Sequence, residues 1–354
     1  VYPAYETPDE IDRKRKRLQA RGLPPVYDRA ALKLSGEERA ALEAAGRKPH
    51  WRFRLSGATV TWEDGVRGSA QIETSALSDP VLVREDGTVL YTFASVVDDI
   101  EMGVTDVVRG EDHVANTGVQ IELFRALGAL PPRFAHHNLI VAATGEEMSK
   151  RKGTLSLRSF REAGAEATAV ASVAVLTGTS NSVRPLQRLE ELTDLIALDQ
   201  LSRAPTKFDP AEIMNLTAKT LHEMSYEDVK QRLLAFGLPG DESEAFWLAV
   251  RGNIATLGDV AIWRDLVFGA AAGVIAEPEY IALATAHLPP EPWDASTWHD
   301  WTEAVKLATG RKGKALYMPL RQALTGLGHG PELGAFLPLM GRAKVLARLH
   351  GRSA

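Results

Sequence analysis

The chain has 354 residues, of which 45% are hydrophobic and 25% are charged, and its formal net charge is −5 at pH 7. This length corresponds to two or three domains with cores of their own, and the longest apolar runs, Ala169–Leu176 and Val267–Ala276, are too short to cross a bilayer. The chain contains no cysteine, which excludes disulfide scaffolds, cysteine-bound zinc and thiol nucleophiles and fits a cytoplasmic protein.

The charge is distributed unevenly along the chain. Residues 1–54 carry a net charge of +5 and residues 300–354 carry +6, whereas residues 55–148 carry −10 and residues 149–299 carry −6. Two basic ends around an acidic middle indicate either an anionic partner, such as a nucleic acid, that is bound at separate places, or simply solvated charged faces.

The first 46 residues predict two helices. Thr7, Pro8 and Glu10 stand at the N-cap, N1 and N3 positions of a helix that continues to Arg21 and ends at Gly22. A second helix is expected from Ser35 to Ala45, closed by Gly46.

Residues 50–91 predict strands instead. His50–Leu55 and Val60–Trp62 alternate between apolar and polar side chains, as half-buried strands do. Val81–Arg84 and Val89–Tyr91 are expected to pair through a hairpin, because Asp86–Gly87 lies between them.

From Phe93 the pattern is α/β. We expect a helix over Ala94–Met102, a strand over Asp106–Val108, a helix over Thr117–Leu127 and a strand over Asn138–Val141. Polar residues follow each of these strands, and open α/β sheets bind their ligands at the carboxyl ends of strands.

After Gly153 the pattern becomes helical, and strand-like runs disappear. Apolar residues recur at spacings of three and four through Leu189–Leu201, Ile213–Leu221 and Val229–Phe236. The expected organisation is therefore α/β first and all-α second.

A loop between Gly145 and Gly153 contains the segment Met148-Ser149-Lys150-Arg151. Cations on a glycine-flanked loop can close on a polyphosphate and stabilise charge that develops on a leaving group. The alternative is an exposed loop whose lysines are solvated.

Tyr91 and Arg109 are expected at adjacent strand ends. A guanidinium can hold a substrate carboxylate through two hydrogen bonds, and a phenol can bind the neighbouring ammonium or carboxylate group. The alternative for Arg109 is a salt bridge to Glu111 or Asp112.

Three other polar groups are weaker candidates. Glu111-Asp112-His113 cannot all face one metal or acid–base centre because the residues are adjacent. The same holds for His136-His137, one of which we expect to be packed or to cap an element. Asp98-Asp99 lie on diverging faces of a helix, which does not favour a carboxylate pair.

The order of these segments closely resembles that of the bacterial glutamyl-tRNA synthetase family, which belongs to the class I aminoacyl-tRNA synthetases. The resemblance covers essentially the whole chain, from Tyr2-Pro3 to Gly330-Pro331-Glu332-Leu333. The matching segments are Tyr91–Asp99, Met102–His113, Asn116–Thr117, Gln120, Phe134–His136 and Met148–Arg151.

The resemblance implies an enzyme that activates L-glutamate with ATP and Mg²⁺ and transfers the glutamyl group to the terminal adenosine of tRNA(Glu). Tyr91 and Arg109 would bind glutamate, with Arg109 on its side-chain carboxylate, and Asp112 and His113 would line the glutamate–ATP pocket. In the loop, Lys150 and Arg151 would act on the phosphates, and Met148 and Ser149 would contact ATP.

Two departures from the family pattern change these expectations. No segment like the family's His-Ile-Gly-His signature occurs, so we expect a chain that lacks the N-terminal part of the family and makes no useful adenylate alone. Many relatives have a cysteine-bound zinc near the segment that matches Tyr2-Pro3-Ala4-Tyr5, and this chain has Ala4 there and no cysteine, so we expect no zinc.

The implied fold is the second half of a Rossmann-like nucleotide fold with an α+β insertion, followed by helical stem-contact and anticodon-binding domains. The expected parts are an acceptor-end-binding insertion (1–88), the second half of the catalytic domain (89–130), a stem-contact region (131–226) and an anticodon-binding domain (227–354).

We expect a monomer with no membrane partner, and the sequence leaves open whether tRNA(Gln) is charged as well. The alternative function is a tRNA-binding module or degenerate paralogue without catalysis.

Overall fold

The structure is a computed structural model that describes residues 1–142, 156–238 and 240–353. It contains two compact units. The first comprises residues 1–148, 178–180 and 196–208, and the second comprises residues 149–177, 181–195 and 209–354. Within the described ranges, no helix combines the length and the apolar character needed to cross a membrane.

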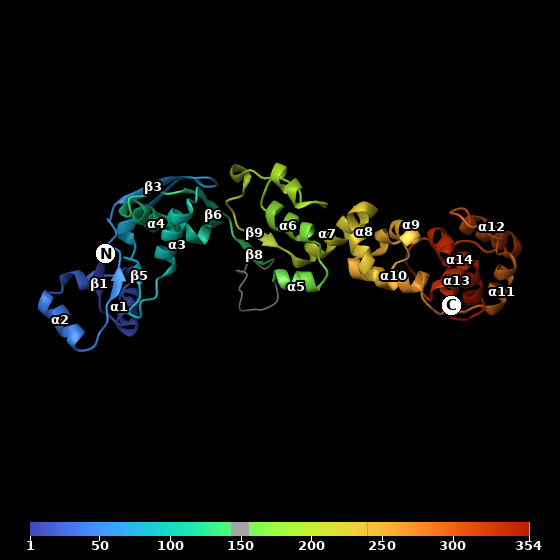
Figure 1. Cartoon of the computed structure of the whole chain (residues 1–354), viewed down its shortest axis with the longest axis horizontal. Coiled ribbons are helices and arrows are strands. Elements are labelled where there is room, and N and C mark those ends of the chain that lie inside the picture. Colours follow the sequence, from blue (N-terminus) through green and yellow to red (C-terminus); the bar gives the residue numbers. More distant parts are fainter. Residues whose placement is uncertain (143–155, 239, 354) are drawn as a thin grey trace. The chain divides into compact units, whose positions relative to one another are not determined.

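The first unit begins with a small antiparallel sheet in the order β1-β2-β5. Its outer strands, β1 and β5, are labelled in Figure 1. Both expected helices are confirmed beside this sheet: Thr7 caps α1 and Ser35 caps α2, each with a complete capping box. In each box the cap hydroxyl accepts from the N3 amide and the N3 glutamate accepts from the cap amide. The bounds are Tyr2–Ala4 (β1), Pro8–Ala20 (α1), Gly36–Ala44 (α2), His50–Arg52 (β2) and Val81–Val83 (β5).

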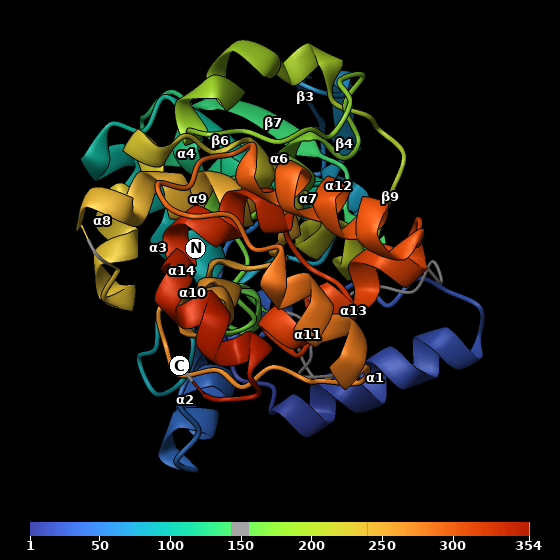
Figure 2. The same cartoon turned by 90° about the vertical axis from the view of Figure 1, so that its right-hand side faces the viewer.

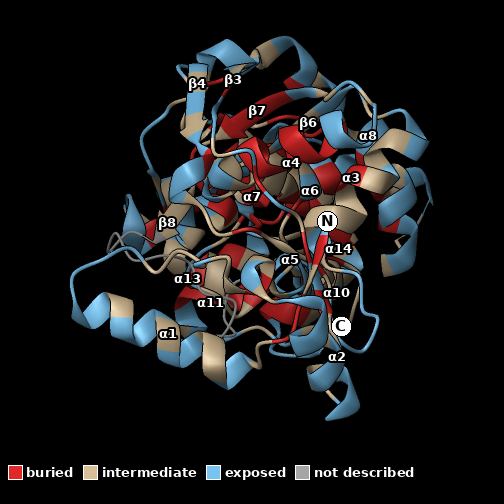
Figure 3. Ribbon diagram, turned by 90° about the vertical axis from the view of Figure 1, so that its left-hand side faces the viewer, coloured by how far each residue is buried: buried red, intermediate tan, exposed pale blue. Residues whose placement is uncertain are grey.

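A four-stranded sheet in the order β4-β3-β7-β6 forms the rest of this unit. β3 and β6 each run parallel to β7, and β4 is antiparallel to β3. Helix α4 packs closely on the sheet, since a Cβ on Gly118 would come within 3.1 Å of Ile72. Figure 3 shows the buried residues of this core on β7 and α4. The bounds are Thr59–Asp64 (β3), Gly68–Glu73 (β4), Tyr91–Met102 (α3), Asp106–Gly110 (β6), Val114–Ala126 (α4) and Arg133–His137 (β7).

One of the predicted strands is wrong. The turn at Asp86–Gly87 forms, but its second arm makes only an isolated bridge between Val83 and Val89. Tyr91 begins helix α3 instead, and the amides of Phe93 and Ala94 donate to the carbonyl of Leu90. The helix forms here in place of the strand because α3 buries Val96 in the core.

The prediction that strands disappear after Gly153 is also wrong. β9 (Thr206–Phe208) pairs in parallel with β8 (Ile140–Ala142), so a short strand from a late segment returns to the first unit. The helix expected over Leu189–Leu201 is two short 3₁₀ turns, Leu189–Leu195 and Leu198–Gln200.

The second unit is helical, as expected. Helices α11 to α14 pack on one another (Figure 2). The core of this unit includes Trp247, Trp301 and Phe336. Gly341 has φ 73°, a value that favours glycine, and it divides α14 with a kink. The bounds are Leu157–Glu162 (α5), Ala167–Leu176 (α6), Pro210–Glu223 (α7), Tyr226–Leu233 (α8), Ser243–Val250 (α9), Val260–Val267 (α10), Pro278–Ala286 (α11), Thr297–Thr309 (α12), Lys314–Thr325 (α13) and Leu333–Leu349 (α14).

Candidate active site

The carboxyl ends of three parallel strands bring together an acid, a cation and an imidazole. Asp64 ends β3, Arg109 lies near the end of β6 and His136 lies near the end of β7. The register pairs Asp64 with Phe134 and Arg109 with His136. This edge is where α/β sheets bind ligands, as the sequence pattern predicts.

Arg109 is held by four neutral hydrogen-bond acceptors. Its Nη2 donates to Thr117 Oγ1 at 2.6 Å and to Gln120 Oε1 at 2.7 Å, and its Nε donates to His136 Nε2 at 3.2 Å. Its Nη1 donates to Tyr91 Oη at 3.3 Å. A guanidinium has five N–H bonds, so, among the residues that the structure describes, one N–H on Nη1 has no acceptor and lies beside Tyr91.

The alternative reading of Arg109 as a salt-bridge partner of Glu111 or Asp112 is wrong. Glu111 accepts from Arg67 at 2.7 Å, and Asp112 lies 3.6 Å from His113. Among the residues that the structure describes, no carboxylate forms an ion pair with Arg109. A cation with only neutral partners has charge left over for an anionic ligand.

Asp64 and His136 form a buried pair behind this cation, and neither side chain is exposed. His136 Nδ1 lies 2.5 Å from Asp64 Oδ2, and Asp64 Oδ1 accepts from the amides of His136, Val66 and Arg67. Burial acts to raise the pKa of Asp64, but these hydrogen bonds outweigh it and lower that pKa to about 2. Burial lowers the pKa of His136, although Asp64 acts against it.

Tyr91 and His113 border the open side of Arg109. Their rings meet edge-to-face with centroids 5.7 Å apart, and Tyr91 is 53% exposed. His113 Nδ1 lies 3.2 Å from the side-chain amide nitrogen, Nδ2, of Asn116. Asp112 lies at the rim with an exposed side chain, so the structure brings Tyr91, Arg109 and His113 together and leaves Asp112 beside them.

The acidic pair Asp98-Asp99 lies on α3 behind the site. Asp98 is exposed, whereas Asp99 is half-buried, and burial raises the pKa of Asp99 while Arg109 acts to lower it. The two side chains differ in burial, which agrees with their expected placement on diverging faces.

Met148, Ser149, Lys150 and Arg151 lie outside the described residues. In the part of the chain that the structure does describe, no group of three His, Cys, Asp or Glu side chains could hold a metal ion.

Four members of the site were missed as functional residues by the sequence reasoning: Asp64, Thr117, Gln120 and His136. Thr117, Gln120 and His136 belong to the segments that carry the family resemblance, and His136 is buried, as expected for one histidine of its pair. Asp64 could have been found as the polar residue that ends a strand before Gly65.

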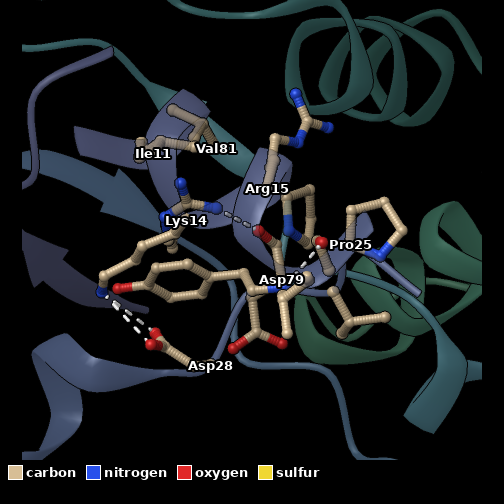
Figure 4. A pocket seen from close by; sticks show the side chains of 13 residues that line it. Ile11, Lys14, Arg15, Pro25, Asp28, Asp79 and Val81 are labelled. Atoms are coloured by element: carbon tan, nitrogen blue, oxygen red, sulfur yellow. Dashed lines mark hydrogen bonds and ion pairs between the residues drawn. The ribbon is translucent and has the colours of Figure 1, made fainter. Parts of the chain in front are cut away.

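A separate cavity of about 310 Å³ lies between α1 and the first sheet (Figure 4). Its lining runs from Ile11 to Val81 and includes Lys14, Tyr27 and Arg52, but none of the residues around Arg109. Lys14 closes one side by an ion pair to Asp28 at 3.2 Å. This cavity is therefore distinct from the candidate site.

Two family models match the chain. Residues 1–215 match the tRNA synthetases class I (E and Q) catalytic domain, and residues 277–352 match an anticodon binding domain. The first match contains every described residue of the candidate site.

Curated relatives match over the full length of the chain. Glutamate–tRNA ligase 2 of Methylobacterium sp. (strain 4-46) is 60% identical over 354 residues, and that of Methylorubrum populi is 57% identical. In both cases the match covers 100% of this chain and 79% of the relative.

A solved structure shares the fold. The crystal structure of a glutamate tRNA ligase from Elizabethkingia meningosepticum, in complex with its amino acid, has a TM-score of 0.80 and 23% identity, and the match covers 99% of this chain and 78% of that one.

Proposed function

Because the chain belongs to the class I glutamyl-tRNA synthetase family, we propose that its site at Arg109 binds L-glutamate for ligation to tRNA(Glu). In this reaction the α-carboxylate of glutamate attacks the α-phosphate of ATP and releases pyrophosphate. The hydroxyl of the terminal adenosine of the tRNA then takes the glutamyl group from the adenylate, and AMP leaves. ATP enters as its magnesium complex, and whether tRNA(Gln) also serves stays open.

The observation that carries this proposal is the state of Arg109. Its guanidinium is half-buried, it has only neutral hydrogen-bond partners among the described residues, and its free N–H lies beside the exposed Tyr91 hydroxyl. The Nη1–H and the Tyr91 O–H form a two-donor end that suits a carboxylate. Glutamine offers one acceptor oxygen and would turn its amide N–H toward a donor, which disfavours it.

The other assignments are proposals of the same kind. His113 and Asp112 would border the ATP side of the pocket, Lys150 and Arg151 would act on the phosphates, and Met148 and Ser149 would contact ATP. Residues 1–88, 89–130, 131–226 and 227–354 would serve as acceptor-end insertion, catalytic half-domain, stem-contact region and anticodon-binding domain. Asp64 on β3 belongs to the first of these parts, so the insertion would also contribute to the glutamate site.

Calorimetric titration of the 354-residue chain with L-glutamate, L-glutamine and L-aspartate tests the glutamate site. We expect glutamate to bind more tightly than both others, because glutamine has no side-chain carboxylate and the carboxylate of aspartate is one methylene short of the Arg109–Tyr91 end. Equal affinities for glutamate and glutamine would contradict the proposal.

We further propose that these 354 residues alone give no useful adenylate synthesis, since no His-Ile-Gly-His-like segment occurs among them. Under this proposal the chain binds glutamate and tRNA without catalysis. Glutamate-dependent exchange of pyrophosphate into ATP, measured with tRNA present, is the test. Exchange at the rate of a full-length relative would contradict it.

A further inference from the structure

We propose that the buried pair Asp64–His136 positions Arg109 for the side-chain carboxylate of glutamate, with the Nε2 lone pair of His136 accepting from the guanidinium. This inference rests on the proposed function, because it concerns how the same site distinguishes glutamate from glutamine. Neither residue needs to touch the substrate, so both would be positioning residues.

The first step of the argument is the direction of the hydrogen bond between Arg109 and His136. Arginine is always protonated and can only donate, so its Nε–H at 3.2 Å requires a lone pair on His136 Nε2. The Thr117 hydroxyl lies 2.9 Å from the same nitrogen. A proton on Nε2 would point the N–H of His136 at the N–H of Arg109, and the two side chains would move apart.

Asp64 fixes the ring in the state that this contact needs. Its Oδ2 lies 2.5 Å from His136 Nδ1, so the single proton of a neutral imidazole is held on Nδ1 and the lone pair on Nε2. Asp64 cannot rotate away, because its other oxygen accepts three backbone amides. The pair is buried on β3 and β7 and faces Arg109 on β6.

The pair completes the fixation of the guanidinium plane. Thr117 and Gln120 hold Nη2 from α4, and His136 holds Nε from the sheet, so the guanidinium is tied at two of its three nitrogens. The third nitrogen, Nη1, then points at Tyr91. Without the His136 acceptor, the guanidinium would no longer be held in one orientation. The two donors that bind a carboxylate, Nη1–H and the Tyr91 O–H, would then be less well placed.

The state of His136 also depends on its charged neighbours. Asp64 favours the protonated ring, whereas burial, Arg109 and Arg67 disfavour it. The Trp62 and Phe134 rings pack against the imidazole and add no charge. We therefore expect the neutral Nδ1–H form to persist at neutral pH in spite of the adjacent carboxylate.

Three variants and one control test the role by calorimetric titration of the chain with L-glutamate and L-glutamine. His136→Phe keeps an aromatic ring but removes the acceptor, His136→Gln keeps an oxygen acceptor near Nε2, and Asp64→Asn removes the group that fixes the ring. The matched control is His50→Phe, because His50 Nε2 accepts from Arg52 Nε at 3.1 Å in the same unit, away from the site.

We expect His136→Phe and Asp64→Asn to lower the glutamate-to-glutamine affinity ratio by about tenfold or more, since small misplacements of a binding group have effects of this size. His136→Gln should restore most of the ratio, and His50→Phe should leave it unchanged. A wild-type ratio in His136→Phe, checked for folding by circular dichroism, would overturn the positioning role.

A second measurement needs no variant to fold. The ¹⁵N chemical shifts of the histidine side chains in the wild-type chain report which ring nitrogen carries the proton. We expect Nδ1 protonated and Nε2 bare for His136 at neutral pH, and an imidazolium or an Nε2–H form would overturn the inference. If the wild-type chain itself shows no preference for glutamate, the proposed function fails and this role falls with it. If the preference is present but insensitive to His136 and Asp64, only this inference fails.

Discussion

The first unit contains the same arginine–histidine contact twice, in two regions with different surroundings. In the small sheet Arg52 Nε donates to His50 Nε2 at 3.1 Å, and in the larger sheet Arg109 Nε donates to His136 Nε2 at 3.2 Å. We refer to these as the closed pair, Arg52–His50, and the open pair, Arg109–His136. A buried aspartate accompanies each, Asp79 the first and Asp64 the second.

The surroundings decide what each pair can do. Asp79 accepts from Tyr2, Arg29 and the Leu55 amide, while Arg52 is only 5% exposed and lies over the Tyr27 ring. The Tyr2 hydroxyl is buried against Asp79, and both effects raise its pKa. The closed pair is thus part of a structural cluster, whereas the open pair has a cation that faces an exposed tyrosine. A buried arginine–histidine contact is therefore evidence of a ligand-binding site only where one end of the guanidinium can be reached by a ligand.

The largest effect is expected from Arg109→Ala. Removal of the charge that binds the substrate carboxylate should weaken glutamate binding by about 3 kcal/mol, or roughly a hundredfold. Arg52→Ala is the matched change in the closed pair and should leave the glutamate-to-glutamine ratio unaltered. Calorimetric titration of both variants measures the difference, and equal losses would remove the distinction between the two pairs.

Asp79→Ala should have the opposite effect to Arg109→Ala: it should lower the stability of the fold and leave the preference for glutamate unchanged. It leaves Arg29, the Tyr2 hydroxyl and the Leu55 amide without their shared acceptor, and breaking such a pair costs about 3 kcal/mol of unfolding free energy. Urea denaturation followed by circular dichroism gives this value. Asp28→Ala, at an ion pair with Lys14 in which both side chains are exposed, is the control and should cost less than about 1 kcal/mol. A change in glutamate preference in Asp79→Ala would show that the two clusters are coupled.

Tyr91→Phe tests the contribution of the hydroxyl that lies beside Arg109 in the open pair. The variant removes one of the two donors proposed for the carboxylate, which should weaken glutamate binding about tenfold and narrow its advantage over glutamine. Tyr27→Phe removes a comparable hydroxyl, which donates to Glu6 at 2.9 Å beside the closed pair, and should leave binding unchanged. Titration with both amino acids decides the outcome, and an unaffected ratio in Tyr91→Phe would contradict the two-donor end.

Local signals were sufficient for much of the fold. The capping residues Thr7 and Ser35 predicted the first helices, and the position of Arg109 at the end of an apolar strand predicted its place at the sheet edge. The closeness of Tyr91 to Arg109 was also anticipated, although Tyr91 reaches it from a helix rather than from a strand.

Long-range pairing was not predictable in the same way. Asp64 meets His136 across 72 residues through the pairing of β3 with β7, and β7 (Arg133–His137) has no marked period-two pattern. β9 is only three residues long, too short to show a period, and it pairs in parallel with β8, which lies more than 60 residues earlier in the chain. Single-sequence patterns report local preferences, whereas these features depend on tertiary contacts.

The smallest expected effect is a dependence on pH. Both pairs should make the unfolding free energy depend on pH, but only the open pair should make glutamate binding depend on pH. Burial lowers the pKa of His50 and of His136 below the ordinary 6.5, with Arg52 adding to the effect at His50. Below about pH 6.5 the unfolded chain takes up these protons before the folded chain does, so the unfolding free energy falls as the pH falls. The slope is at most about 1.4 kcal/mol per pH unit for each group.

Urea denaturation at several pH values measures this slope, and His50→Phe and His136→Phe should each remove a part of it. Glutamate preference should respond differently: it should decline with acid only as His136 takes up its proton, and His50→Phe should not alter that decline. If the decline followed His50 instead, the closed pair would be acting on the site, and the division between a structural and a functional arginine–histidine pair would not hold.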